Sequence, residues 1–300
     1  MIEYLFLSLL LLAMYAVSLW SSGIEGFESG ESVTIEEIDK IYDEEYATIH
    51  NALWNSSKES SDFIDVSMQD IMLADKQTTS VNVLDLCCGT APHACFFKNL
   101  GVEYTGVDLS GDMLAKARTV CPGTKFQKGD VTNASLFAPK SFSHAIMLGM
   151  SIYQFPNPKV ISDNAFQWIE PGGTFLVYLV EPDKYDPILN LASPFSAFSL
   201  QKYSLERQTK SEIYFDRFKF SGELKKKKNE DDATYTEILT YFDPANSPAK
   251  VKYREQIHHW TMPSLERMIE IIKSSGFRLK EKVDLVSVGK EYQYLVYFTK

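Results

Sequence analysis

The 300-residue sequence lacks both glycine patterns with which proteins commonly bind nucleotide phosphates. Neither G-x-G-x-x-G nor G-x-x-x-x-G-K-[ST] occurs anywhere in the chain. These glycines let the backbone approach a pyrophosphate or triphosphate closely. A dinucleotide-dependent oxidoreductase and a P-loop nucleotidase are therefore not predicted.

The sequence also lacks an excess of basic residues. Lys and Arg number 30 against 40 Asp and Glu, which gives a formal net charge of −10. A protein that binds a long stretch of nucleic acid neutralises many phosphates with Lys and Arg. We therefore expect no nucleic-acid partner.

Cysteine is scarce, and its spacing does not suit a metal site. The four cysteines are Cys87, Cys88, Cys95 and Cys121, and no C-x-x-C pair or paired histidine spacing accompanies them. Zinc sites usually show such spacings. We predict no metal, and we interpret all four as small buried thiols in a reducing compartment.

Charge is absent from residues 4–20, which read YLFLSLLLLAMYAVSLW. At about 1.5 Å per residue, a helix of this length is marginally able to cross a bilayer core. Residues 1–23 are therefore predicted to be a membrane anchor. A cleaved signal peptide and an internally packed helix remain alternatives. Because no Lys or Arg precedes Lys40, the side of the membrane is not predicted from charge; we expect the remaining chain in the cytosol, with the secretory pathway as the alternative.

The segment that follows is polar and then helical. Residues 24–33 are rich in Gly, Ser and Glu and are predicted to be a linker. Thr34 and Glu37 have the spacing of a capping box, so a helix is expected to begin there. Residues 34–80 are assigned as an N-terminal helical region.

From residue 82 onward, apolar strands alternate with helical patterns. Four strands are expected within VNVLDL, VEYTGVDLS, SHAIMLGMSI and TFLVYLVEP, with a weaker one in TKFQKGDVTN. Such alternation is typical of a parallel sheet with helical crossovers. Residues 81–182 are assigned as this core. Residues 183–260 alternate like antiparallel strands, and residues 261–300 are expected to form a helix and two more strands.

Three carboxylates follow the predicted parallel strands. Asp85 lies at the end of the first strand, Asp108 at the end of the second and Asp130 after the third. Ligands of doubly wound sheets bind at the carboxyl ends of the strands. Asp108 is placed to accept ribose hydroxyls and Asp130 an adenine amino group, while Asp85 would repel phosphate and attract an ammonium or sulfonium group. The pattern predicts a nucleoside ligand that carries positive charge.

Residues 82–181 resemble class I S-adenosylmethionine-dependent methyltransferases of the small-molecule type. The similar motifs, in chain order, are VLDLCCGTA, YTGVDLSGDMLAKAR, FQKGDVTN, HAIMLGMSIYQF and IEPGGTFLVYLVEP. The resemblance implies an α/β fold with a doubly wound, Rossmann-like seven-stranded sheet. It would carry an antiparallel β insertion after strand five and, in this chain, follow an N-terminal hydrophobic helix. The family usually has glycine where Cys87 and Ala91 stand.

The resemblance also implies a cofactor, S-adenosyl-L-methionine, and roles for individual residues. The methionine part would be surrounded by Asp85, Cys87, Gly89 and Ala91. The ribose would bind Asp108, and the adenine would contact Leu109, Met113, Asp130 and Val131. The residues expected under the reacting methyl group are Leu148, Gly149 and Ser151.

The acceptor is expected to be a small or lipid-like molecule that is methylated at O, N or C. The alternative is a catalytically silent methyltransferase fold that serves as a membrane-tethered binding module. Tyr42 and Tyr46 lie one helical turn apart and resemble a tyrosine-bearing lid, so Tyr42 is predicted to bind substrate and Tyr46 to take part in catalysis. On an alternating strand, His258 and His259 face opposite ways, and one of them is expected to act as the base. The further acceptor-side residues predicted are Tyr153 and Glu181.

Overall fold

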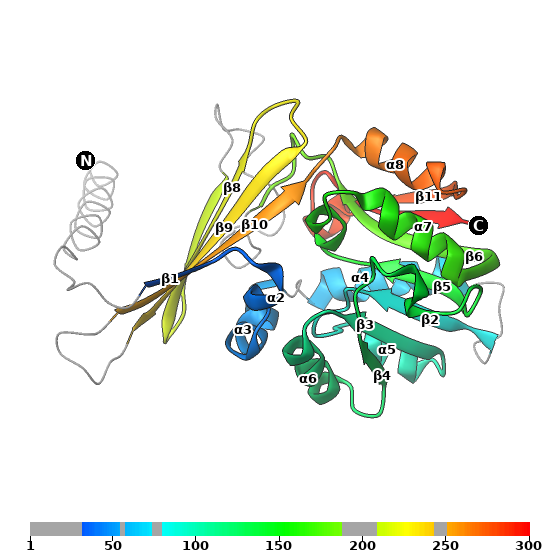
Figure 1. Cartoon of the computed structure of the whole chain (residues 1–300), viewed down its shortest axis with the longest axis horizontal. Coiled ribbons are helices and arrows are strands. Elements are labelled where there is room, and N and C mark those ends of the chain that lie inside the picture. The colour runs from blue at the N-terminus through cyan, green and yellow to red at the C-terminus, as the bar shows by residue number, and fades with distance from the viewer. Residues whose placement is uncertain (1–31, 55–57, 74–79, 188–208, 243–250) are drawn as a thin grey trace, which may run out of the picture.

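The computed structural model describes residues 32–54, 58–73, 80–187, 209–242 and 251–300. These residues form two β-sheets with helices packed around them (Figure 1). The predicted hydrophobic segment 4–20 and most of the predicted linker lie outside the described residues. Within the described ranges, no helix has the length and hydropathy that a membrane span requires.

The larger sheet has the predicted seven strands. Its spatial order is β11-β12-β6-β5-β2-β3-β4, and only β12 runs against its neighbours. The strands are β2 (Asn82–Leu86), β3 (Glu103–Asp108), β4 (Lys125–Lys128), β5 (Phe142–Met147), β6 (Ile169–Val180), β11 (Arg278–Asp284) and β12 (Gln293–Thr299). The central strands are buried, as the apolar runs predicted. The carboxyl ends of β2, β3 and β4 meet at one edge.

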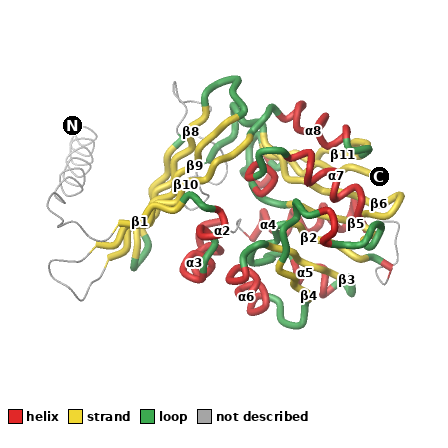
Figure 2. Tube along the Cα trace, in the orientation of Figure 1, coloured by secondary structure: helices red, strands yellow, loops and turns green. Residues whose placement is uncertain are grey.

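Helices connect and cover these strands (Figure 2). The helices are α4 (Lys58–Met68), α5 (Ala94–Asn99), α6 (Gly111–Val120), α7 (Pro158–Trp168) and α8 (Leu265–Ser274). Helix α7 packs beside α8, where Phe166 meets Phe277 edge to face. Short helical turns follow α4 and β5, at η1 (Gln69–Leu73) and η4 (Ser151–Gln154), and two more lie at η3 (Ala134–Leu136) and η7 (Val286–Val288).

The second sheet has the order β1-β10-β9-β8-β7. Its four antiparallel strands are β7 (Lys210–Tyr214), β8 (Phe218–Lys226), β9 (Asp232–Phe242) and β10 (Val251–Thr261). They correspond to the antiparallel strands predicted after residue 182. On β9, the inward face carries Ala233, Tyr235, Glu237 and Leu239, all buried. One carboxylate therefore lies among apolar side chains.

The predicted helix start at Thr34 is wrong. Residues Ser32–Ile35 form strand β1, which pairs in parallel with β10, so the linker also ends earlier than predicted. Thr34 Oγ1 donates a hydrogen bond to Glu255 at 3.0 Å and caps no helix. Val33, Thr34 and Ile35 are β-branched residues that suit a strand, and the open edge of β10 supplies the partner that local sequence cannot show.

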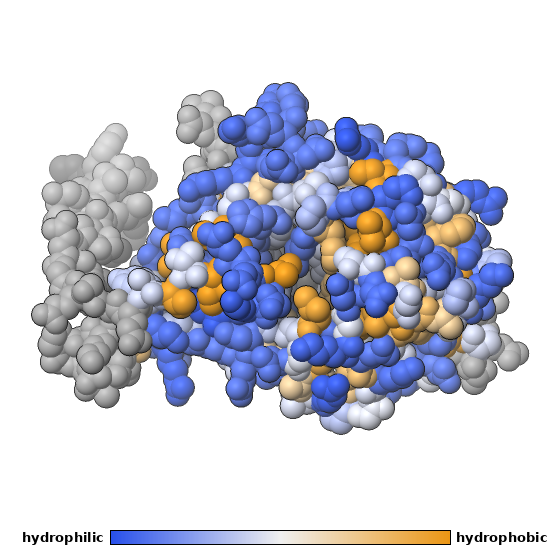
Figure 3. Space-filling view, viewed as in Figure 1, coloured by the Kyte–Doolittle hydropathy of each residue, from blue (hydrophilic) through white to orange (hydrophobic). Residues whose placement is uncertain are grey.

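The helical segment that follows β1 lies between the second sheet and α6 (Figure 1). It comprises α2 (Ile38–Ile41) and α3 (Glu44–Trp54). Arg254 of β10 is 2% exposed and donates hydrogen bonds to Asp43, Glu45 and the carbonyl of Ile41. On the face shown in Figure 3, hydrophobic side chains gather toward the middle of the molecule, and the outer parts are largely hydrophilic.

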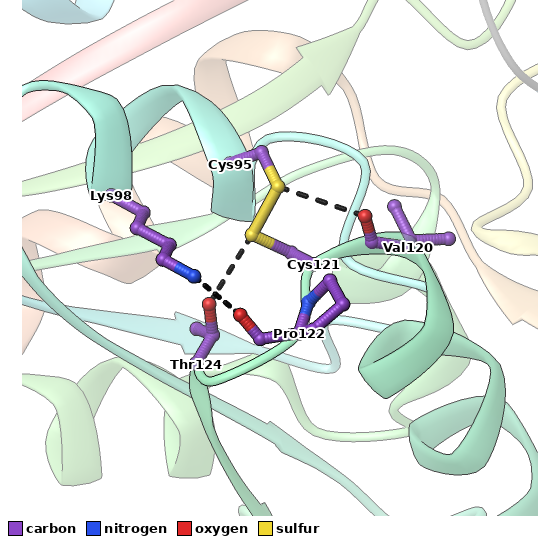
Figure 4. Close-up of a disulfide and its surroundings, with 6 residues drawn as sticks. All are labelled: Cys95, Lys98, Val120, Cys121, Pro122 and Thr124. Carbon is purple, nitrogen blue, oxygen red and sulfur yellow. Dashed lines mark hydrogen bonds between the residues drawn. A yellow bond between two sulfur atoms is a disulfide. The ribbon is translucent and has the colours of Figure 1, made fainter.

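The prediction of four free thiols is wrong for two of them. Cys95 at the start of α5 and Cys121 just after α6 form a disulfide with a Cα–Cα distance of 5.4 Å (Figure 4). Cys87 and Cys88 remain free. The two bonded cysteines are 26 residues apart, and no local pattern marks them as partners. The fold places the start of α5 beside the end of α6, where Cys95 also contacts the Val120 carbonyl.

Candidate functional site

A cavity of about 680 Å³ lies between the two sheets. One wall consists of the loops after β2, β3, β4 and β5, and the opposite wall consists of α3 and β10. This volume is within the range of small-molecule and cofactor sites. A cavity therefore lies where the strand-end carboxylates predicted a ligand to bind.

The loop after β2 has an unusual backbone. Cys87, Gly89 and Ala91 all have left-handed conformations, with φ of 55°, 54° and 52°. Only Gly89 is a glycine, and a Cβ there would lie 3.3 Å from the Met113 side chain. A non-glycine residue in this region typically costs on the order of 1 kcal/mol or more. The loop thus keeps a glycine-like path at two positions that lack glycine.

Asp85 lies beneath this loop and is 4% exposed. Tyr104 donates a hydrogen bond to its carboxylate at 2.5 Å. Burial raises the pKa of Asp85 to about 7, although the Tyr104 hydrogen bond and the nearby His93 act in the opposite direction. A buried carboxylate of this kind favours a cationic group beside it.

Asp108 links three parts of the cavity wall. Its carboxylate accepts hydrogen bonds from the backbone amides of Gly89 at 2.8 Å and Ser110 at 2.9 Å. Ser110 caps α6 through the amide of Met113 and donates its hydroxyl to the carbonyl of Tyr42. Each carboxylate oxygen retains a lone pair that can accept a hydrogen bond from a hydroxyl group.

The opposite wall is aromatic. Tyr42 and Tyr46 approach each other edge to face with ring centroids 5.7 Å apart, and Trp260 of β10 stacks on Tyr235 at 4.9 Å. The Tyr42 hydroxyl accepts a hydrogen bond from Gln154 Nε2 at 2.7 Å. The N-terminal helices therefore contact both sheets and close this side of the cavity.

Comparison with known proteins agrees with this geometry. Residues 83–173 match the family model described as a methyltransferase domain. The trans-aconitate 2-methyltransferase of Rhizobium meliloti is 24% identical over 197 residues, which cover 65% of this chain and 67% of that protein. The demethylmenaquinone methyltransferase of Chlorobaculum parvum is 32% identical over 101 residues, covering 33% of this chain and 40% of that protein.

A solved structure shares the fold. The S-adenosylmethionine-bound CalS10, an amino pentose methyltransferase from Micromonospora echinaspora, has a TM-score of 0.58 and 16% identity, and the match covers 85% of this chain and 96% of that one. The chain is a class I S-adenosylmethionine-dependent methyltransferase. Its cofactor is S-adenosyl-L-methionine.

The residues of the methyltransferase's cavity fit this cofactor. Asp85 is a buried carboxylate that suits a positively charged ligand, and the oxygens of Asp108 suit ribose hydroxyls. Most of the predicted cofactor residues line the cavity: Asp85, Cys87, Gly89, Asp108, Leu109, Met113, Asp130, Val131, Leu148, Gly149 and Ser151. Ala91 does not, because its methyl group is fully buried in the hydrophobic core.

Three acceptor-side predictions are wrong about where the side chains lie. His259 is 67% exposed and faces Glu36 on the outer side of β10. Tyr153 is buried behind the cavity, where its hydroxyl accepts a hydrogen bond from the Val180 amide at 2.8 Å. Glu181 follows β6 and lines a separate, smaller hollow. The strand alternation and the packing of β6 turn these side chains away.

Tyr42, Tyr46 and His258 do line the cavity of the methyltransferase. Sequence reasoning missed Glu237, which accepts hydrogen bonds from both Tyr46 and His258. The available signal was a single acidic residue on the inward face of the strand pattern ATYTEILTYF. The wall residues Trp54, Gln154 and Lys290 were also missed, and no local pattern distinguishes them.

Proposed function

We propose that the methyltransferase transfers a methyl group to an oxygen, nitrogen or carbon atom of a small molecule bound beside the aromatic wall. The single observation that carries this proposal is the cavity, which joins the strand-end carboxylates to an aromatic pocket under the second sheet. Pockets for small ligands are typically apolar with a few convergent polar groups. The relatives named for trans-aconitate, demethylmenaquinone and an amino pentose support a small acceptor.

The cofactor would lie along the ends of the parallel strands. Asp85, Cys87 and Gly89 would surround its methionine part, with Asp85 near the ammonium group. Asp108 would accept the ribose hydroxyls. The adenine would lie between Met113 and Leu109, and its edge would meet Asp130 and Val131.

Bound S-adenosylmethionine supplies a methyl group on a positively charged sulfur. The protein's own task is alignment, because the acceptor atom must attack in line with the carbon–sulfur bond. Leu148, Gly149 and Ser151 would support the cofactor from below, and the lid residues Tyr42 and Tyr46 would hold the acceptor above it. The closed aromatic wall would exclude water from the reacting atoms.

The first test is calorimetric titration of the full chain with S-adenosylhomocysteine. We expect micromolar binding, and we expect Asp108→Ala to weaken it at least about 10-fold because a charge-assisted hydrogen bond contributes about 1.5–3 kcal/mol. Asp112→Ala is the matched control, since Asp112 is an exposed aspartate four residues further on, in helix α6 and outside the cavity. A folded wild-type chain that does not bind would refute the cofactor site.

The second test is turnover. Labelled S-adenosylmethionine is incubated with a panel of small amines, hydroxyl compounds and carboxylates, and formation of S-adenosylhomocysteine is measured. Turnover with a member of the panel supports the enzyme. Tight cofactor binding without turnover would instead favour a catalytically silent binding module.

A further inference from the structure

A buried carboxylate organises the acceptor side of the cavity. Glu237 of β9 is 0% exposed. Its carboxylate accepts hydrogen bonds from three side chains: the Tyr46 hydroxyl at 2.8 Å, Gln256 Nε2 at 2.7 Å and His258 Nε2 at 3.2 Å. Burying a carboxylate is costly unless donors surround it. Here each donor comes from a different position on α3 or β10, so the site is constructed by tertiary packing.

Glu237 is ionised in this environment. Burial acts to raise its pKa, but the hydrogen bond and electrostatic attraction of His258, together with the hydrogen bonds from Tyr46 and Gln256, outweigh burial and lower the pKa below its ordinary value. An ionised carboxylate can only accept hydrogen bonds. The groups that contact it must therefore be donors.

This requirement places a proton on one nitrogen of the histidine. His258 must carry its proton on Nε2, which leaves Nδ1 with a free lone pair in the neutral ring. The orientation of Gln256 is fixed in turn, because its Oε1 accepts from Arg254 Nε at 2.7 Å while its Nε2 donates to Glu237. The Tyr46 hydroxyl donates to Glu237 and accepts from Trp54 Nε1 at 2.9 Å.

The free nitrogen of His258 has no partner among the described residues. Nδ1 is buried and unpaired, and the ring lines the cavity, with its centroid 6.1 Å from that of Tyr42. Buried polar atoms in native proteins are nearly always hydrogen-bonded. Two other nitrogens of the same cavity wall, His50 Nδ1 and Trp260 Nε1, are also buried and unpaired in the described part of the chain, so this wall is where the polar groups of a ligand are expected to bind. The missing partner of an acceptor nitrogen is a donor, that is, an O–H or N–H group.

We propose that His258 Nδ1 is the base that receives the proton of the methyl acceptor, and that Glu237 is the positioning residue that holds the ring in this tautomer. The inference rests on the proposed function and narrows it to acceptors that lose a proton, namely a hydroxyl or a protonated amine. A carbon acceptor without an acidic proton would have no use for this arrangement.

The step is balanced within the site. A hydroxyl oxygen uses its lone pair directly and passes its proton to His258 Nδ1, whereas a protonated amine must first give its proton to Nδ1 to free the lone pair. That lone pair forms a bond to the methyl carbon while the carbon–sulfur bond breaks, and the sulfur keeps the electron pair as a neutral thioether. The resulting imidazolium is paired with Glu237, and the proton later leaves to solvent. No additional reactant is needed.

The test begins without an acceptor. The full chain is labelled with ¹⁵N-histidine, and the five histidines are resolved by side-chain NMR, with His258→Asn assigning the signal. We expect a neutral His258 ring protonated on Nε2, and a mixture of tautomers in Glu237→Gln. A wild-type ring protonated on Nδ1, or fully charged near neutral pH, would overturn the inference. The titratable side chains that face this ring are Glu237 and Tyr235 from β9, Tyr46 from α3, and Tyr42 after α2.

Turnover then separates the two roles. With an acceptor from the panel, His258→Asn is expected to lower kcat by about 100-fold or more, and Glu237→Gln by about 10- to 100-fold with a displaced rate–pH profile. His259→Ala is the matched control on the opposite face of β10, and its rate should not change. S-adenosylhomocysteine binding should stay within about twofold in every variant.

The outcomes are distinguishable. If the wild-type protein does not bind S-adenosylhomocysteine, the proposed function itself is refuted. If the wild type binds it and His258→Asn turns over as fast as the wild type, only the role of His258 as the base is refuted. An amine acceptor adds its own pKa to the rate–pH profile, and an aliphatic hydroxyl acceptor does not. Circular dichroism of Glu237→Gln checks folding, and Tyr46→Phe, which keeps the Glu237–His258 contact, should retain the tautomer.

Discussion

At the scale of single residues, the loop after β2 keeps a glycine-like backbone at two other residue types. Cys87 and Ala91 stand where the family usually has glycine, and both adopt the left-handed conformation of Gly89. The sequence showed the substitutions but not how the backbone would respond. The structure shows that the loop path is retained, and the Asp108 hydrogen bond to the Gly89 amide helps to hold it.

Asp85 leads to a prediction about pH. Its pKa of about 7 in the folded protein lies above the ordinary value of 3.8 because of burial. Between these two values the unfolded chain releases a proton that the folded protein retains. The free energy of unfolding should therefore fall as pH rises from about 4 to 7, by up to about 1.4 kcal/mol per pH unit, and then level off.

The test uses Asp85→Asn in the absence of ligand. The variant has no carboxylate to ionise in the protein interior. We therefore expect it to be more stable than the wild type at pH 8, by at most about 4 kcal/mol, and we expect this difference to shrink toward pH 5. Urea unfolding at both pH values measures this, with Asp112→Asn as an exposed control. The same variant should bind S-adenosylhomocysteine more weakly. Lower stability of Asp85→Asn at pH 8 would contradict the prediction.

At the scale of elements, strand alternation predicted that His258 and His259 point to opposite faces of their strand. Alternation alone does not say which face meets the cavity, so both were candidates. The pairing of β10 with β9 and β1, and the packing of α3 against this sheet, place His258 inside and leave His259 in solvent. The predicted helix at Thr34 failed for a related reason, because its true partner is a strand more than 200 residues away.

The disulfide gives a prediction about α5 and α6. A bond that closes a loop between residues 26 apart is expected to contribute about 3–4 kcal/mol, chiefly by restricting the unfolded chain. Dithiothreitol should therefore lower the thermal midpoint of the wild type. It should not affect the double variant Cys95→Ser/Cys121→Ser, whereas Cys88→Ser should remain sensitive.

Thiol counting checks the same bond independently. Alkylation of the unreduced, denatured protein should modify only Cys87 and Cys88, as detected by mass spectrometry. Modification of all four cysteines would contradict the pairing. Because disulfides persist mainly in oxidising compartments, a confirmed bond would favour the secretory alternative over a cytosolic domain.

At the scale of the whole molecule, the N-terminal segment connects the two sheets. Arg254 binds it to the second sheet, and the hydrogen bonds of Ser110 to the Tyr42 carbonyl and of Thr90 to Asn51 bind it to the first. The cavity therefore depends on both sheets and on α3. A ligand that fills it should stabilise all three parts together.

Hydrogen exchange with S-adenosylhomocysteine tests this coupling. At about 100 times its dissociation constant, the ligand should add about 2.7 kcal/mol to the free energy of unfolding. Exchange should slow in residues 87–92 and 108–113 and also in α3, while the exposed outer strand β11, which exchanges by local opening, should change least and serves as the control. Slower exchange confined to residues 87–92 and 108–113 would contradict a ligand site that includes α3.

The sequence by itself determined the parallel core, the position of the cofactor loop and the three strand-end acids. It could do so because strand and helix periods are local, and because the topology of a parallel sheet gathers the ends of its strands at one edge. Only the tertiary structure decided which histidine faces the cavity, which cysteines bond and which carboxylate contacts that histidine. Tyr46 and Glu237 are 191 residues apart, and a contact of that kind arises from the packing of one element against another, which no local pattern encodes.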